Sequence, residues 1–126
     1  MIENILDASA ALAYLQNEPG KEKVEAVLET SAISWVNATE VLTKLVEKGM
    51  SLDEAKEAFD NLGLQVIEFG ENQSLKAAEL RPLTKHLGLS LGDRCCLALA
   101  ILETLPAVTA DKNWASLSFC EIEVIR

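Results

Sequence analysis

Three aspartates occupy positions at which an α/β protein places groups that bind ligands. Asp7 directly follows the apolar run at residues 2–6, and Asp111 follows the run at residues 107–109. Asp93 stands at the start of a long apolar segment. Ligands of a parallel sheet bind beyond the carboxyl ends of its strands, so the three side chains are expected at one edge. Carboxylate oxygens gathered there would suit Mg²⁺ or Mn²⁺.

Each of these aspartates also has a purely structural explanation. A carboxylate at the start of a helix accepts hydrogen bonds from free amides and complements the helix dipole. The spacing Ser90-x-x-Asp93 fits a capping box. Taken singly, the aspartates are better explained as helix caps. Taken together they favour a metal site, because like charges at one edge repel and a dry cluster protonates unless a cation lies among them.

Glu40 is the fourth acidic residue considered for the site. It lies on a predicted helix with a buried apolar stripe, and it falls with Asn37, Lys44 and Glu47 on the opposite face. A solvated face explains this group without any function. Periodicity alone therefore does not place Glu40 in the site.

No other chemistry has its key residues in the sequence. The G-x-S-x-G, P-loop and G-x-G-x-x-G motifs are absent, which argues against hydrolase and nucleotide-loop sites. The single histidine, His86, has no cysteine or aspartate pattern beside it and is interpreted as a surface residue. Cys95 and Cys96 lie in the apolar segment, where cysteine is usually a small buried hydrophobe. Trp35 and Trp114 are interpreted as packing residues and not as platforms for base stacking, although Trp114 lies close to Asp111 and could be both.

The elements that must position the acids follow from hydrophobic periodicity. Apolar runs predict strands at residues 2–6, 32–35, 64–69, 107–109 and 121–125. Helices are predicted at residues 8–16, 21–29, 36–48, 51–62, 72–86 and 93–103, the fifth of them broken or kinked at Pro82. Strands that alternate with helices predict an α/β fold, a parallel sheet with helices on both faces.

Composition sets limits on the class of protein. The chain has 126 residues, 49% of them hydrophobic and 25% charged, which is typical of one globular domain. The formal charge of −9 argues against binding nucleic acid through bulk charge. Three cysteines without C-x-x-C spacing argue against a disulfide framework or a zinc ribbon. No signal peptide or membrane-spanning segment is recognised, so a cytoplasmic protein is expected.

Four stretches of the chain resemble one known family. They are residues 5–10 with Asp7, 36–42 with Glu40, 88–100 with Asp93, and 109–114 with Asp111. In this order and spacing they resemble the PIN-domain ribonucleases, and more narrowly the VapC toxins of bacterial type II toxin–antitoxin pairs. The narrower resemblance rests on the single-domain length and on the Gly-Leu-Ser-Leu-Gly-Asp stretch. The resemblance covers essentially residues 1–126, as a single PIN domain.

The resemblance implies a PIN-like three-layer α/β/α sandwich with a central, mainly parallel sheet of four to five strands. Four positions match the acids that are catalytic and bind Mg²⁺, with Mn²⁺ as a substitute: Asp7, Glu40, Asp93 and Asp111. Three match polar positions beside the site: Ser9, Asn37 and Thr109. The resemblance, and not the helical pattern, recruits Glu40.

The implied activity is hydrolysis of RNA phosphodiester bonds by a metal-activated water, which needs no nucleophilic side chain. Phosphate contacts are expected from nearby bases: Lys21, Lys23, Arg81, Lys85, Arg94 and Lys112. The implied partners are the RNA substrate, a cognate antitoxin that wraps the toxin and blocks the acidic pocket, and a second copy of the chain in a homodimer.

Two other functions stay open at this point. One is a PIN-like binding or assembly module without nuclease activity, whose acids only cap helices. The other is a PIN nuclease that processes RNA outside a toxin–antitoxin pair. A phospho-acceptor receiver domain is discounted, because Asn4 and the third predicted strand, which ends before Gly70, do not supply its paired acids and acceptor aspartate.

Overall fold

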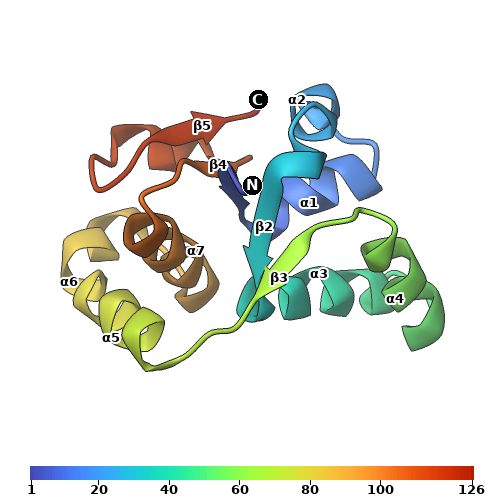
Figure 1. The fold of residues 1–126 in the computed structure, drawn as a ribbon, viewed down its shortest axis with the longest axis horizontal. Helices are drawn as coiled ribbons and strands as arrows, with labels where there is room; N and C mark the ends of the chain where they lie inside the picture. The colour runs from blue at the N-terminus through green and yellow to red at the C-terminus, as the bar shows by residue number, and fades with distance from the viewer.

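The computed structural model describes residues 1–126 and has five parallel strands with helices on both faces (Figure 1). The strands are β1 (Asn4–Leu6), β2 (Ser31–Ser34), β3 (Gln65–Ile67), β4 (Ala107–Thr109) and β5 (Ile122–Val124). The longer helices are α1 (Ala8–Leu15), α3 (Trp35–Glu47), α4 (Leu52–Asp60), α5 (Glu71–Glu79) and α7 (Leu91–Glu103). The short elements are α2 (Lys21–Glu25), α6 (Arg81–Thr84), and the 3-10 turns η1 (Leu28–Thr30), η2 (Lys85–Leu87) and η3 (Lys112–Ser116).

The sheet has the strand order β3-β2-β1-β4-β5, so β1 is central. Ile5 of β1 pairs with Ala32 of β2 on one side and with Ala107 of β4 on the other. The chain builds outward from β1 through β2 to β3, then returns to the other side of β1 for β4 and β5. The carboxyl ends of β1 and β4 therefore meet where the strand order reverses, which is where open α/β sheets bind ligands.

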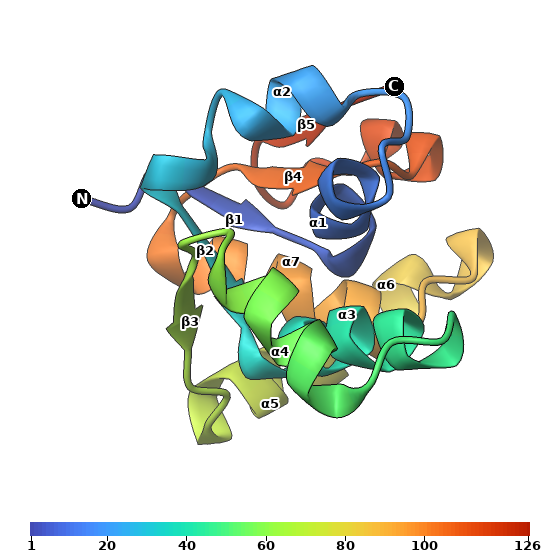
Figure 2. The same ribbon diagram turned by 90° about the vertical axis from the view of Figure 1, so that its right-hand side faces the viewer.

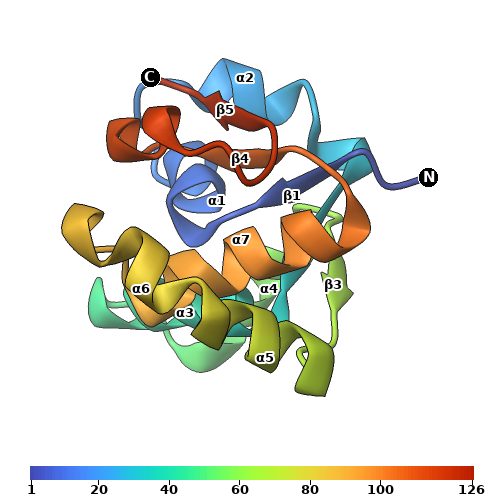
Figure 3. The ribbon, with the colours of Figure 1, turned by 90° about the vertical axis from the view of Figure 1, so that its left-hand side faces the viewer.

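Alternating strand residues face the two helical layers. Ile5 packs with buried residues of α5 and α7, whereas the next residue, Leu6, packs against α1 and α2. Helices α1 to α4 cover one face of the sheet, as Figures 1 and 2 show. Helices α5 to α7 cover the other face (Figure 3). The predicted α/β/α sandwich with a parallel sheet is confirmed.

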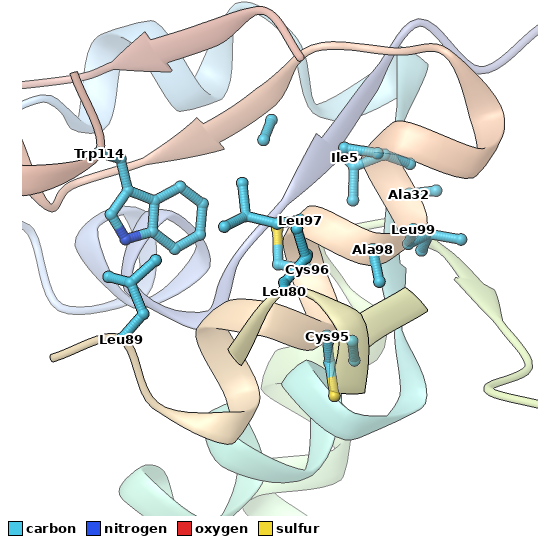
Figure 4. Close-up of a cluster of buried hydrophobic side chains, with 13 residues drawn as sticks. Ile5, Ala32, Leu80, Leu89, Cys95, Cys96, Leu97, Ala98, Leu99 and Trp114 are labelled. Carbon is cyan, nitrogen blue, oxygen red and sulfur yellow. The ribbon is translucent and has the colours of Figure 1, made fainter. Parts of the chain in front are cut away.

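Helix α7 lies in the centre of the largest core cluster (Figure 4). Every residue from Cys95 to Ala100 is buried, which explains why this helix is apolar nearly all round. The ring of Trp114 is fully buried and packs in the same cluster as Leu89. The other tryptophan, Trp35, is 45% exposed, so the predicted packing role is confirmed for Trp114, whereas Trp35 is partly open to solvent.

Three of the differences from the predicted helix boundaries have a clear local reason. The predicted helix 21–29 ends at Glu25 and gives way to η1. The predicted helix 72–86 divides at Leu80, and Pro82 lies in the first turn of α6, where its missing N–H costs no hydrogen bond. Helix α7 begins two residues earlier than predicted, because Ser90 is its N-cap. None of the helices has the length and apolar character needed to span a bilayer.

Candidate active site

The four acidic side chains singled out in the sequence line one cleft at the carboxyl edge of the sheet. Asp7 follows β1, and Asp111 follows β4. Asp93 lies in the first turn of α7, and Glu40 lies in the middle of α3. The cleft has a volume of about 260 Å³ and is lined by Asp7, Ala8, Ser9, Leu12, Asn37, Glu40, Lys44, Asp93 and Asp111.

Asp7 is the buried member of the four, with 3% of its surface exposed. Its Oδ1 accepts a hydrogen bond from the backbone N–H of Ala10 at 2.8 Å, which makes Asp7 the N-cap of α1. The hydroxyl of Ser9 donates to both carboxylate oxygens, at 2.7 and 2.9 Å. The hydroxyl of Thr109 donates to Oδ2 at 2.6 Å. These contacts fix the Asp7 carboxylate between the ends of β1 and β4.

The two hydroxyls that serve Asp7 are themselves oriented by backbone amides. The N–H of Ala110 donates to Ser9 Oγ at 2.9 Å, and the N–H of Asp111 donates to Thr109 Oγ1 at 3.1 Å. Each hydroxyl accepts from an amide and is left to donate its proton to Asp7. Thr109 is fully buried beneath the cleft, so it supports the site from below.

Burial has the largest effect on the pKa of the Asp7 carboxyl. As the largest of several causes, burial leaves this pKa raised from 3.8 to about 6. The hydrogen bonds from Thr109, Ala10 and Ser9 lower the pKa and so oppose this effect, while the negative charge of Asp93 raises it further. None of the donors is a cation. The ionised carboxylate therefore lacks a counter-charge, and a bound cation would supply one.

Asp93 and Asp111 each cap a helical turn while facing the cleft. Asp93 N–H donates to Ser90 Oγ at 3.1 Å, and Asp93 Oδ2 accepts from the Ser90 N–H at 2.9 Å, which completes the predicted capping box. Asp111 Oδ1 accepts from the N–H of Asn113 at 2.9 Å and caps η3. The structural role and the place in the cleft thus coexist in the same side chains.

Glu40 reaches the cleft through contacts that helical periodicity did not reveal. Its Oε1 accepts a hydrogen bond of 2.8 Å from Asn37 Nδ2, and that nitrogen also donates to the Gly92 carbonyl of α7 at 3.0 Å. Asn37 is 1% exposed, so it belongs to the interior and not to a solvated face. Because Gly92 has no side chain, the Glu40 carboxylate lies directly against the first turn of α7.

The donor chemistry of the cleft fits a hard divalent cation such as Mg²⁺ or Mn²⁺. The acidic groups that line the cleft offer carboxylate oxygens, which are the ligands that such cations prefer, and Asp7 is buried without a positively charged partner. In the present arrangement of the side chains, no group of three or more His, Cys, Asp or Glu residues is close enough together to hold a metal ion. Each carboxylate is instead hydrogen-bonded to its local neighbours. Like charges separate when no cation lies among them, so binding an ion would draw the partly exposed carboxylates of Asp93 and Asp111 towards Asp7.

Lys44 lines the cleft but is not among the basic residues that the sequence analysis predicted to contact phosphate. Lys44 lies one helical turn after Glu40 and is exposed. It takes part in none of the ion pairs of the structure, which are Lys56–Asp60, Lys76–Glu79 and Arg126–Glu18. Its position on α3 at the i+4 spacing from Glu40 is the signal that could have identified it.

The bases predicted to contact phosphate lie outside the lining of the cleft. Arg81, Lys85 and Lys112 are exposed. Arg94 is half-buried, and its guanidinium donates to the Ala77 carbonyl of α5 at 2.9 Å. The Nε of Arg94 is buried without a partner. Arg94 therefore links α5 to α7.

The cysteines do not offer a thiolate to the site. Cys96 is fully buried, and burial raises its pKa well above the usual value, with the negative charges of Asp7, Asp93 and Glu40 among the smaller causes. Burial also raises the pKa of Cys95 to about 11. Both thiols stay neutral at physiological pH and act as small apolar groups of the core.

Comparison of the fold with solved structures gives several similar chains. A chain of a toxin–antitoxin complex from Klebsiella pneumoniae has a TM-score of 0.79 at 20% identity, with 98% of both chains covered. A chain of DNA-bound VapBC from Salmonella typhimurium has a TM-score of 0.80 at 16% identity, and one of VapBC2 from Rickettsia felis bound to a promoter DNA fragment has 0.77 at 19%. Both of these comparisons cover 100% of each chain. At such identities the likeness concerns the fold.

The sequence itself also points to a family. A search among curated proteins gives no match. A family model described as the PIN domain matches residues 5–119, a span that includes Asp7, Glu40, Asp93 and Asp111. The matched span takes in nearly the whole chain, and the chain therefore belongs to the PIN domain family.

Proposed function

We propose that this chain is a metal-dependent endoribonuclease that acts as the toxin of a type II toxin–antitoxin pair. The observation that carries the proposal is the single cleft lined by Asp7, Glu40, Asp93 and Asp111, four acids from four separate parts of the chain. Membership of the PIN domain family supports a nuclease, and the likeness in fold to chains of VapBC complexes supports the toxin branch.

Asp7 and Asp93 are the residues proposed to hold the cation, with Glu40 and Asp111 completing the acidic wall. A bound Mg²⁺ or Mn²⁺ supplies a water of lowered pKa and neutralises charge on the phosphate. Among the carboxylates, Glu40 is suited to receive a proton from the attacking water. Its Oε1 is engaged by Asn37, whereas its Oε2 has no hydrogen-bond partner and is free to accept.

Positive groups near the cleft are proposed to hold the RNA backbone. Lys44 lines the cleft and has no carboxylate partner, so it is placed to contact the phosphate next to the scissile bond. Arg81, Lys85, Arg94 and Lys112 are proposed as contacts further along the strand. Because the chain as a whole carries a charge of −9, local placement of bases has to replace bulk attraction.

The proposed partners are a cognate antitoxin, which would cover the acidic cleft, and a second copy of the chain. The similar structures are described as toxin–antitoxin complexes, some of them with DNA, and this motivates the antitoxin. A toxin of this kind would act on RNA in the cytoplasm.

The test is RNA cleavage by the purified chain with Mg²⁺, with Mn²⁺ and with a chelator, together with growth after induction of the lone chain. Cleavage is expected only with the divalent ion, and Asp7→Asn and Asp93→Asn are expected to abolish it while the proteins stay folded. Asp53→Asn, which alters an exposed acid of α4, is the matched control and should cleave as wild type does. Full activity of Asp7→Asn would overturn the proposal.

Two alternatives give different results in the same experiments. A binding or assembly module would cut no RNA, and Mn²⁺ would not change its melting temperature. A PIN nuclease that processes RNA outside a toxin–antitoxin pair would cut a defined precursor, and its induction would not arrest growth. An adjacent small reading frame that encodes a DNA-binding head and a flexible tail would favour the toxin.

A further inference from the structure

The carboxylate of Glu40 occupies the space that a side chain at position 92 would fill. A Cβ built on Gly92 would lie 2.5 Å from both Cδ and Oε1 of Glu40, and closer still to Oε2. All three contacts are far shorter than real Cβ contacts, and all involve the end of one flexible side chain. An added methyl group would therefore displace the Glu40 carboxylate and leave the backbone of α7 in place.

A second set of contacts fastens Glu40 in this position. Asn37 Nδ2 donates to Glu40 Oε1 at 2.8 Å and to the Gly92 carbonyl at 3.0 Å, so it bridges α3 and α7. Asn37 Oδ1 accepts from the hydroxyl of Ser34 at 2.9 Å, which fixes the orientation of the amide. The start of α7 also favours a nearby negative charge through the helix dipole. Glu40 is thus held beside Asp93, the residue that follows Gly92.

We infer that Gly92 is a positioning residue: the absence of its side chain lets the Glu40 carboxylate lie across the start of α7, where Asn37 holds it beside Asp93. The inference rests on the proposed function, because it concerns the acid that would receive the proton from the attacking water. In this role Gly92 contacts neither the substrate nor the ion and acts only through Glu40.

The backbone conformation at position 92 does not require glycine. Its φ lies outside the left-handed region, and the residue sits in the first turn of a regular α-helix. Alanine is a better helix former than glycine. Gly92→Ala is therefore expected to fold with a melting temperature equal to or above that of wild type, while Glu40 is pushed out of its place.

The experiment compares Gly92→Ala with wild type in Mn²⁺ affinity, measured by calorimetry, and in the kinetics of RNA cleavage. Loss of a group that orients a ligand typically costs about 10- to 100-fold in metal affinity or activity. We expect a fall in kcat in that range, with KM changed by less than about twofold, and weaker Mn²⁺ binding. Leu91→Ala is the matched control, because Leu91 lies in the same turn, is 61% exposed and does not line the cleft.

A double-variant cycle separates positioning from a general effect on the helix. Glu40→Asp shortens the side chain by one methylene, so it should lower kcat when residue 92 is glycine. In the Gly92→Ala background the shorter side chain avoids the added methyl group, and Glu40→Asp should restore part of the lost kcat and Mn²⁺ affinity. A purely structural role of Gly92 predicts equal effects of Glu40→Asp in both backgrounds.

Three results would overturn the inference. They are wild-type kcat and Mn²⁺ affinity in Gly92→Ala, equal effects of Glu40→Asp in the two backgrounds, and loss of folding in Gly92→Ala that Glu40→Asp does not repair. Asn37→Asp removes the donor without adding a methyl group and should also lower kcat. If wild type binds Mn²⁺ but cuts no RNA, the proposed function fails, and the affinity cycle still decides the role of Gly92.

Discussion

Replacing Asp7 by asparagine should stabilise the metal-free protein at neutral pH. Asp7 is buried, all of its hydrogen-bond donors are neutral, and no cation balances its charge. Asparagine is close in shape, is a good N-cap residue and can still accept the hydrogen bond from the N–H of Ala10. The variant removes the charge and leaves the fold and the cap of α1 in place.

The expected size follows from the pKa of Asp7, which rises from 3.8 to about 6 on folding. A difference of about two pH units corresponds to about 3 kcal/mol. The pKa of Asp7 is higher in the folded state than in the unfolded state. The contribution of Asp7 to the free energy of unfolding is therefore greatest below pH 4 and is lost as the pH rises through about 6. At pH 7.5 Asp7→Asn should therefore exceed wild type by about 1–3 kcal/mol, the lower figure allowing for the altered hydrogen bond with Thr109.

The assay is urea unfolding of wild type and Asp7→Asn at several pH values between 4 and 7.5, with a chelator present. The difference in free energy of unfolding should grow across this interval and level off above pH 6. Mn²⁺ at 1,000 times its dissociation constant should then reverse the order, since it adds about 4.1 kcal/mol to wild type alone, more than the expected difference. Asp53→Asn, at an exposed residue outside the cleft, is the control and should leave the stabilisation by Mn²⁺ as it is in wild type.

A variant that is less stable than wild type by the same amount at every pH would contradict this prediction. The hydrogen bonds of Asp7 would then outweigh the cost of burying its charge. Equal stabilisation of both proteins by Mn²⁺ would show that the ion binds elsewhere.

Three further substitutions test other parts of the site. Lys44→Met should raise KM for RNA by about tenfold, equivalent to about 1.4 kcal/mol, and make KM less dependent on salt, whereas Lys56→Met, outside the cleft, should change neither. Ser90→Ala removes the N-cap of α7 and should lower the free energy of unfolding by about 1 kcal/mol, seen as a lower urea midpoint. Arg94→Met breaks the hydrogen bond to the Ala77 carbonyl and should lower that free energy by about 1–2 kcal/mol, seen as a lower urea midpoint; a raised KM for RNA in the folded variant would support its proposed RNA contact as well, and an unchanged midpoint would contradict the link between α5 and α7.

The parts of the fold that depend on local sequence were predictable. Strands and helices alternate in clear apolar patterns, and the capping box at Ser90 and Asp93 follows from spacing. Asp7 and Asp111 were identifiable because Asp7 directly follows β1 and Asp111 lies two residues after β4, and strand ends share an edge in a parallel sheet. Such features need no knowledge of distant contacts.

Features that depend on contacts between distant residues were not predictable from periodicity. Glu40 is exposed, as its pattern predicts, but periodicity does not show that its carboxylate lies against Gly92 on another helix. Asn37 shares that pattern but is buried, because it bridges α3 and α7. Trp35 has the residue type of the core, yet it is 45% exposed at the start of α3. These cases depend on which helices pack together.

The aspartates of the cleft have a consequence for how such a protein could evolve. Asp7 and Asp111 are N-caps, and Asp93 completes a capping box, so each also stabilises the local backbone. Asparagine and serine serve well as caps but carry no charge. A single nucleotide change from aspartate to asparagine could therefore silence the chemistry without unfolding the chain. A folded but inactive variant is therefore one substitution away. Evolution could keep such a variant for its binding surfaces alone.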